Sequence, residues 1–174
     1  FFGTVGWNVI ELKYGKLLQQ AFDAPGGGAL MNRIDTCSNQ LYSALTFQGG
    51  AAWRTHLKAD LGRTKGIKAL LDDHDDATLH RLMTNLGGHD MTATLEAFNS
   101  VTDDTPQGCV AYTIKGYNTP LAGHKDNHSG LMNLEQMADY KAAHNIRDGH
   151  EWDIAEGLGI DADALQKFLA DVAF

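Results

Sequence analysis

The sequence predicts an α/β fold in which helices flank a parallel sheet. Two segments rich in β-branched and aromatic residues, 7–13 (WNVIELK) and 109–115 (CVAYTIK), are separated by a long run of helical patterns. Strands that alternate with helices in this way pair in parallel. The 174 residues, 43% of them hydrophobic, are enough for one domain with a proper core.

The first predicted strand is followed at once by a helical pattern over 16–24. Pro25 and the three glycines after it must end that helix, because proline cannot continue it and glycine favours a break. Residues 29–47 are ambiguous, but helical spacing continues after a break at Ser38-Asn39. Residues 48–62 favour a short helix that begins at a glycine turn.

Residues 67–86 favour two helices separated by the acidic loop DDHDD. Asp75 or Asp76 is suited to cap the second helix, because a short acceptor side chain at this position bonds the free amides of the first turn. Asp90 occupies the same kind of position before a helix over 91–101.

In the helix over 91–101 we expect three apolar side chains to face inward: Leu95, Phe98 and Val101. The second strand, 109–115, is nearly continuous in apolar and β-branched residues, which is typical of a strand covered on both faces. Beyond its loop, Asn133 and Gln136 form a capping box for a helix over 134–144. A last amphipathic helix begins at Asp161 and carries its apolar side chains on one side: Leu165, Leu169 and Val172.

Composition and charge exclude several classes of function. The net charge of −8 argues against a nucleic-acid surface, which needs clustered basic residues. No window has the roughly 18 consecutive apolar residues of a membrane helix. Cys37 and Cys109 are far apart, and we expect buried thiols in a reducing, cytoplasmic environment. The three tryptophans are expected in the core or in an interface: Trp7, Trp53 and Trp152.

The glycine-rich loop over 116–130 follows the carboxyl end of the second predicted strand. In α/β sheets the ligand crevice lies beyond the carboxyl ends of strands, so this loop is the first candidate for function. It contains His124 and His128, four residues apart, in the run GHKDNHSG. Three interpretations are open: a metal pair, an ordinary solvated loop, or another kind of active site.

The spacing of His124 and His128 matches a zinc pair on one helical turn. However, Lys125 lies between them, no glutamate fills the base position, and Pro120 disfavours a regular helix. The metal interpretation is therefore the weakest of the three. Glycines let the backbone approach a ligand closely, and imidazoles near Lys115 suit an anionic or proton-transfer site. A solvated loop stays open as the ordinary alternative.

Four motifs, GWNVI, GGHD, TIKGY and HKDNHSG, occur in one order along the chain. In this order they resemble thiamine-diphosphate enzymes of the transketolase superfamily, and most closely the homodimeric decarboxylating components of pyruvate dehydrogenase complexes. The resemblance covers nearly the whole chain and is weakest at 23–66. It implies a parallel sheet with flanking helices that is part of a thiamine-diphosphate-binding, transketolase-like domain.

The resemblance also implies roles for three residues. Lys115 matches a lysine that faces the cofactor, where it would stabilise negative charge on the thiamine-bound intermediate or the diphosphate. His128 matches a loop histidine at the channel mouth, which would move protons or position the acyl acceptor. His124 is a further catalytic candidate from the same loop. For His89 of the GGHD motif, a structural role in orienting its turn is favoured.

The same enzymes hold Mg²⁺ and the cofactor diphosphate through a G-D-G followed some thirty residues later by an Asn. This sequence contains no such motif, so the metal ligands are expected outside this chain. By the resemblance, residues 1–130 correspond to the second half of the cofactor-binding domain. Residues 131–174 correspond to a helical tail or linker toward a next domain.

The activity implied by the resemblance is decarboxylation of a 2-oxo acid, pyruvate, with acyl transfer to a lipoyl-bearing acyltransferase subunit. The parent is expected to be a homodimer that needs thiamine diphosphate and Mg²⁺, and the isolated chain is expected to be inactive. Transketolase chemistry on ketose phosphates is an alternative, because the run HKDNHSG also looks like the transketolase loop. A non-catalytic subunit that pairs with a partner carrying the metal motif is a third possibility.

Overall fold

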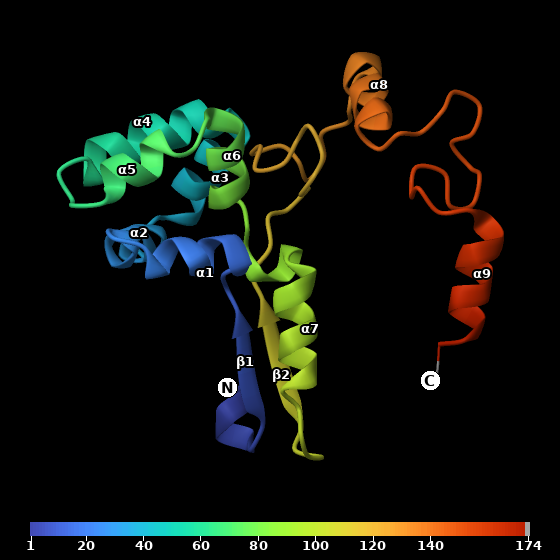
Figure 1. The fold of residues 1–174 in the computed structure, drawn as a ribbon, viewed down its shortest axis with the longest axis horizontal. Helices are drawn as coiled ribbons and strands as arrows, with labels where there is room; N and C mark the ends of the chain where they lie inside the picture. The colour runs from blue at the N-terminus through green and yellow to red at the C-terminus, as the bar shows by residue number, and fades with distance from the viewer. Residues whose placement is uncertain (173–174) are drawn as a thin grey trace. The chain divides into compact units, whose positions relative to one another are not determined.

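The computed structural model describes residues 1–172, which fall into two compact units, Phe1–His128 and the described residues from Ser129 onward. The first unit contains both strands and most of the helices, and the second is built of helices and loops (Figure 1). No helix within residues 1–172 is long and apolar enough to cross a membrane.

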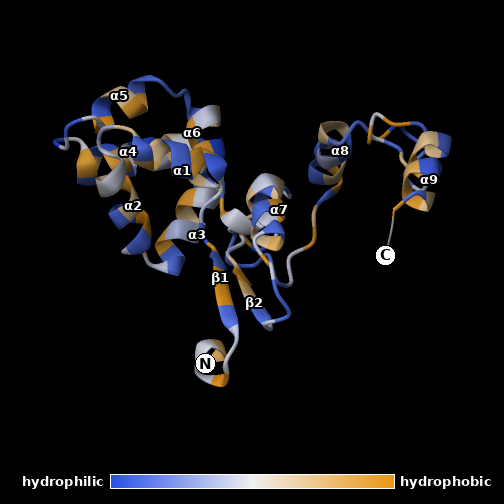
Figure 2. Cartoon of the chain, turned by 60° about the horizontal axis from the view of Figure 1, so that its bottom comes forward, coloured by the Kyte–Doolittle hydropathy of each residue, from blue (hydrophilic) through white to orange (hydrophobic). Residues whose placement is uncertain are grey.

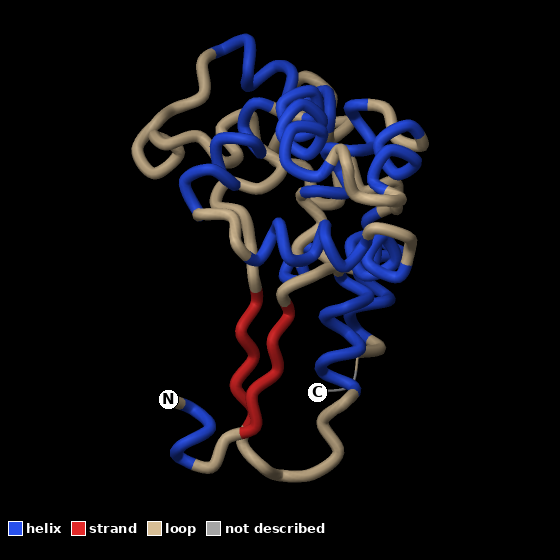
Figure 3. Tube along the Cα trace, turned by 90° about the vertical axis from the view of Figure 1, so that its left-hand side faces the viewer, coloured by secondary structure: helices blue, strands red, loops and turns tan. Residues whose placement is uncertain are grey.

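Two parallel strands form the sheet of the first unit (Figure 3). A short 3₁₀ helix, η1 (Phe2–Val5), leads into β1 (Asn8–Leu12), which pairs with β2 (Gln107–Ala111). The register places Asn8 opposite Gln107 and Leu12 opposite Ala111. The predicted α/β fold with a parallel sheet is confirmed.

The second strand differs from its prediction in both extent and burial. β2 begins at Gln107 and ends at Ala111, so most of the predicted segment 109–115 lies beyond it. The strand is also not covered on both faces, and Val110 is 41% exposed. An apolar run indicates that a strand can be buried, but burial requires neighbours. Within residues 1–172, β1 is the strand that pairs with β2.

Six helices follow β1 and enclose the main core of the first unit (Figure 1). They are α1 (Lys16–Asp23), α2 (Gly27–Asp35), α3 (Asn39–Gln48), α4 (Gly50–Leu61), α5 (Ile67–Asp72) and α6 (Asp76–Met83). Trp53 on α4 is only 2% exposed, and its ring contacts Tyr42 on α3 edge-to-face at 5.1 Å. Leu18, Leu79 and Met83 are fully buried around it, so the core joins α1, α4 and α6.

The breaks between these helices lie where the sequence predicts them. The Ser38 hydroxyl accepts the Leu41 amide at the start of α3, and the Asp75 carboxylate accepts the Thr78 amide at the start of α6. The break after α1 is short, because Gly27 already begins α2. Glycine is required there, since a Cβ on Gly27 would lie 2.1 Å from the Phe22 carbonyl oxygen.

Helix α7 (Met91–Asn99) packs on β1 through a face other than the predicted one. Ala93 and Ala97 are buried against Leu12, whereas Leu95 is 55% and Phe98 61% exposed. The predicted inward face, which also included Val101, is therefore wrong. The helix is apolar on more than one side, and its small alanines allow a closer approach to the strand than bulky side chains would.

The second unit contains α8 (Leu134–Ala143) and α9 (Ala162–Ala170). The predicted capping box is confirmed, because Asn133 and Gln136 each bond the other's backbone amide. Asp161 caps α9 by accepting the amides of Asp163 and Ala164. None of the described residues in this unit is buried. Figure 2 shows hydrophobic residues along α9 as well as along β1.

The expectation of buried cysteines is wrong, and the core position expected of the tryptophans is confirmed for Trp53. The cysteines are free but not buried, since Cys37 is half-buried and Cys109 is exposed. Trp53 is a core residue as expected, but Trp7 is partly exposed and Trp152 is 96% exposed, so neither belongs to a core.

Candidate functional site

A cleft of about 1140 Å³ lies beside the end of β2, in the first unit. Its lining comes from α3, from the segment that continues β2 and from the histidine loop. Its polar and charged lining residues include Lys13, Asp35, Asn39, Gln40, Ser43, Gln48, Tyr112, Lys115, His124, Lys125 and Asn127. Two of its three lysines pair with carboxylates, Lys13 with Asp35 and Lys125 with Asp126. Lys115 has no carboxylate partner among the described residues, which suits it to an anionic ligand.

Lys115 and His128, which the sequence singles out, lie next to each other. The Nζ atom of Lys115 is 2.7 Å from Nδ1 of His128. A lysine ammonium only donates hydrogen bonds, so in this contact Nδ1 accepts and the imidazole proton lies on Nε2. The pair presents an ammonium and a ring N–H from two segments 13 residues apart.

The loop backbone fixes Lys115 through its carbonyl oxygen. That oxygen accepts the side-chain amide of Asn127 at 2.7 Å and the backbone amide of Gly123 at 3.4 Å. Gly123 has a φ of +74°, and a Cβ there would lie 2.5 Å from the Ser43 carbonyl on α3. The glycine therefore lets the loop close against α3, which brings Asn127 and His128 back to Lys115.

His124 lies on the cleft but is not seen paired with His128. Its ring contacts Phe47 on α3 edge-to-face at 4.5 Å, and its Nδ1 accepts the Asp126 amide at 3.1 Å. The loop forms a series of turns instead of a helix, so the four-residue spacing does not align the two imidazoles as it would on a helix. The geometry gives no support to a zinc pair.

A second charged group at the cleft was not anticipated from the sequence. The carboxylate of Asp35 accepts hydrogen bonds from the Lys13 ammonium and the Tyr14 hydroxyl. The bond from Lys13 holds the pKa of Asp35 below its usual range, while burial raises the pKa of Tyr14 to about 12. Lys13 directly follows β1, so the strand-end rule that selected the loop over 116–130 could also have found it.

His89 lies behind the site, in the 3₁₀ turn η2 (Gly87–His89). Its Nε2 is 2.7 Å from the Ile114 backbone nitrogen, and its ring stacks on Tyr117 at 3.7 Å. Burial lowers the pKa of this imidazole. His89 thus contacts the chain before Lys115, at Ile114, and after it, at Tyr117, which goes beyond the role in its own turn that the sequence favoured.

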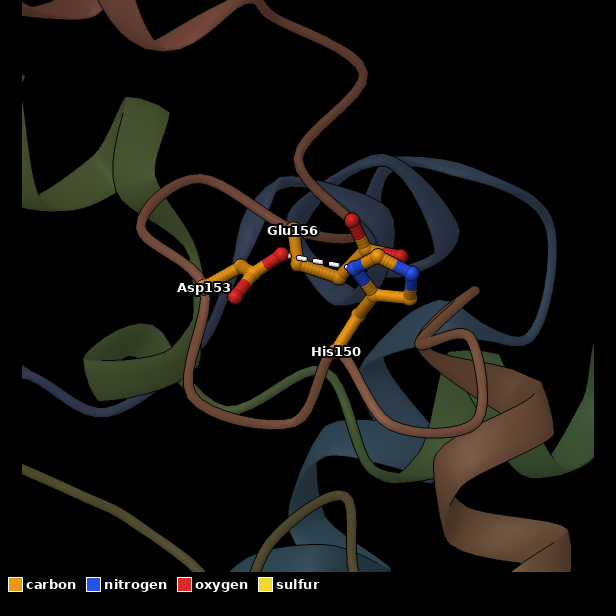
Figure 4. Close-up of side chains that lie close together, drawn as sticks. All are labelled: His150, Asp153 and Glu156. Atoms are coloured by element: carbon orange, nitrogen blue, oxygen red, sulfur yellow. Dashed lines mark hydrogen bonds and ion pairs between the residues drawn. The ribbon is translucent and has the colours of Figure 1, made fainter.

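A cluster of His150, Asp153 and Glu156 occurs in the second unit, and Figure 4 shows the three side chains converging. The His150 ring bonds Asp153 at 2.6 Å. Both Glu156 oxygens accept from the Arg147 guanidinium, at 2.8 and 2.9 Å. Both oxygens of Glu156 and one oxygen of Asp153 are therefore engaged by protein groups, which weakens the cluster as a metal site.

The chain matches no family model. It is 33% identical to a "Pyruvate dehydrogenase E1 component" of Mycobacterium tuberculosis over 153 residues, and 31% identical to one of Mycolicibacterium smegmatis over 152 residues. It is 29% identical to one of Escherichia coli over 149 residues. These matches cover 84%, 85% and 84% of this chain, respectively.

The chain spans only 15–16% of the length of these relatives. The match nevertheless includes most of the chain, in keeping with motifs distributed from its first strand to its histidine loop. The resemblance found in the sequence is therefore confirmed as homology to one segment of such proteins.

Proposed function

We propose that this chain, which is homologous to one segment of pyruvate dehydrogenase E1 components, forms one wall of a thiamine-diphosphate site in a 2-oxo-acid dehydrogenase component. The observation that carries the proposal is the pairing of the Lys115 amine with the His128 ring beside a large basic cleft. Two residues selected by motif alone lie within hydrogen-bond distance of each other, which favours a shared role over two idle loop residues.

The cleft fits the cofactor in size and chemistry. Ligand pockets for molecules of this size are commonly about 300–1,000 Å³, and the cleft is of that order. The Lys115 ammonium and the side-chain amides of the lining suit a diphosphate. Asp35 is engaged by Lys13 and Tyr14, so we place the Mg²⁺ ligands on polypeptide outside these residues.

When bound, the cofactor supplies the nucleophilic carbon and the electron sink for decarboxylation. Lys115 stabilises negative charge that develops on the reacting oxygens. His128 would give up its Nε2 proton only as its Nδ1 takes a proton from the Lys115 ammonium, so that the ring stays neutral, and both transfers reverse as product leaves. His124, held against Phe47, lines the approach to this pair.

The natural substrate is then a 2-oxo acid such as pyruvate, and the acyl acceptor is a lipoyl-bearing subunit. We expect the working protein to be a homodimer. The free thiols Cys37 and Cys109 support a reducing, cytoplasmic location for this activity.

The test replaces Lys115 and His128 separately by alanine in the complete enzyme that carries this sequence. We expect kcat for pyruvate to fall roughly 10²–10⁴-fold, as removal of a proton-transfer or charge-stabilising group does. Both side chains are exposed, so the free energy of unfolding should change by less than about 0.5 kcal/mol.

The matched control is Lys58→Ala, which removes an exposed lysine of α4 that does not line the cleft. Its activity should equal that of the unchanged enzyme. Normal turnover in both Lys115→Ala and His128→Ala, with normal folding, would refute the proposed roles.

Two other functions remain to be separated from this one. Turnover of a ketose phosphate but not of pyruvate would favour transketolase chemistry. The exposed apolar residues Phe1, Phe2 and Phe168 favour a non-catalytic subunit if the complete assembly is inactive with both substrates.

A further inference from the structure

The segment that carries Lys115 lies beyond the end of the parallel ladder. Its last sheet-like bond joins the Tyr112 amide to the Leu12 carbonyl at 3.0 Å, and β1 then leaves the sheet direction. Beyond this point, the turn η2 lies beside the segment that carries Lys115. The Gly87 amide bonds the Lys13 carbonyl at 3.0 Å, and the Gly88 amide bonds the Tyr112 carbonyl at 3.0 Å.

Two residues beyond Tyr112, the amide of Ile114 bonds a side chain instead of a backbone carbonyl. Its acceptor is Nε2 of His89, at 2.7 Å. A backbone N–H can only donate, so Nε2 carries the lone pair, the ring proton lies on Nδ1, and the imidazole is neutral. The His89 side chain therefore acts as one further rung of the sheet.

The same imidazole also contacts the chain after Lys115, at Tyr117. The His89 and Tyr117 rings stack at 3.7 Å with an interplanar angle of 10°. Between the two anchors the chain makes a tight turn, with the Tyr117 amide on the Ile114 carbonyl at 3.0 Å and Gly116 at a φ of +71°. Because Ile114 is also buried in the main core, the backbone that carries Lys115 is anchored on that side.

We propose that His89 is a positioning residue for Lys115: its neutral ring fixes Ile114 before the lysine and Tyr117 after it, and thereby aims the Lys115 amine at His128. The inference rests on the proposed function of Lys115, but the geometry it describes can be measured without any cofactor. Protonation of His89 removes the acceptor of the Ile114 amide, so the segment should loosen in acid.

The charged groups around His89 do not replace that acceptor. On its own turn, the Asp90 carboxylate is bonded to the amides of Ala93 and Lys16. On α7, which packs against the turn, Glu96 pairs with the Lys16 ammonium. On the facing segment, Lys115 is cationic and Tyr117 offers its ring face. Burial lowers the pKa of His89 below its usual 6.5, which keeps the ring neutral near pH 7.

Two variants separate the contributions of the ring. His89→Gln keeps an acceptor near the Nε2 position, and His89→Phe keeps the stacking surface without an acceptor. His74→Phe is the matched control, because it also removes a bond from a histidine ring to the backbone, that of Nδ1 to the Leu70 carbonyl, away from the cleft. Protection of the Ile114 amide against hydrogen exchange is compared with that of the Tyr112 amide as an internal reference.

In the unchanged protein we expect Ile114 protection to fall relative to Tyr112 as pH drops below about 6.5. His89→Gln should keep the protection and make it independent of pH. His89→Phe should lose it at all pH values and lower kcat of the complete enzyme at least about tenfold, because misplacement of a reacting group costs that much or more. His74→Phe should change neither quantity.

Retained Ile114 protection in His89→Phe, or an equal loss of kcat in His89→Gln and His89→Phe, would overturn the positioning role. Failure of the proposed function has a different signature. In that case Lys115→Ala has normal turnover, while the Ile114 amide still responds to the His89 variants and to pH.

Discussion

Asp90 stabilises two helices from one side chain. One carboxylate oxygen accepts the Ala93 amide in the first turn of α7 at 3.0 Å, and the other accepts the Lys16 amide at the start of α1 at 2.8 Å. The second oxygen also accepts from the side-chain amide of Asn85. The first bond is local and was predicted from the sequence. The second joins residues 74 positions apart, and no local pattern encodes it.

The double role of Asp90 predicts a larger stability loss than an ordinary cap gives. Asp90→Ala should lower the free energy of unfolding by about 2–4 kcal/mol, because loss of one N-cap typically costs about 1 kcal/mol and two further donors lose their acceptor. The matched control is Asp75→Ala, whose side chain caps α6 alone and should cost about 1 kcal/mol. Urea denaturation measures both. Equal losses in the two variants would show that the bond to α1 contributes nothing.

At the scale of elements, the sequence located helices more reliably than it oriented them. The starts of α3, α6, α7 and α8 follow from caps, since Ser, Asp and Asn act on amides two or three residues away. The buried face of α7 did not follow, because the helix is apolar on two sides and the choice depends on how closely β1 approaches. The extent of β2 also failed, because strand pairing depends on a partner far along the chain.

The face of α7 that contacts β1 can be tested by two substitutions on neighbouring residues. Ala97→Leu should lower the free energy of unfolding by about 1–3 kcal/mol, because added methylenes in a packed interface force strain. Phe98→Gln, on the exposed face, should change it by less than about 0.5 kcal/mol. Chemical denaturation of both variants gives the comparison. The reverse order would restore the face predicted from the sequence.

At the scale of the candidate site, motifs identified the site residues but not the residues that hold them in position. Lys115 and His128 were selected by resemblance, and their contact depends on Gly123 and Asn127, which bend the loop back on itself. The loop can fold back in this way only where its backbone fits closely against α3, and the spacing of residues in the sequence does not show that fit. The Lys13–Asp35 pair was missed for a similar reason, since its members lie 22 residues apart and belong to no motif.

Across the whole molecule, the two units differ in how they are stabilised. The first has a continuous core around Trp53, whereas no described residue of the second is buried. The second unit relies on caps and on ion pairs that each have an exposed partner, in which Lys141 binds Asp148 and Glu151 and Arg147 binds Glu156. Exposed pairs contribute little and are weakened by salt. The second unit should therefore open at a lower free-energy cost than the first.

Acid should open the second unit first. The hydrogen bond from Lys141 lowers the pKa of Glu151 from 4.5 to about 2, and the bond from Arg147 lowers that of Glu156 from 4.5 to about 2. A carboxyl with a depressed pKa stabilises the folded state above its unfolded pKa, and this contribution is lost as pH falls from about 4.5 toward 2. Amide hydrogen exchange across this range should show early loss of protection in α8, while the Met83 region of α6 stays protected.

The control Lys58→Ala leaves both pairs intact and should keep the same order of loss. Simultaneous loss in α8 and α6 would instead mean that the two units unfold as one cooperative body, and that the ion pairs of the second unit do not limit its stability in acid.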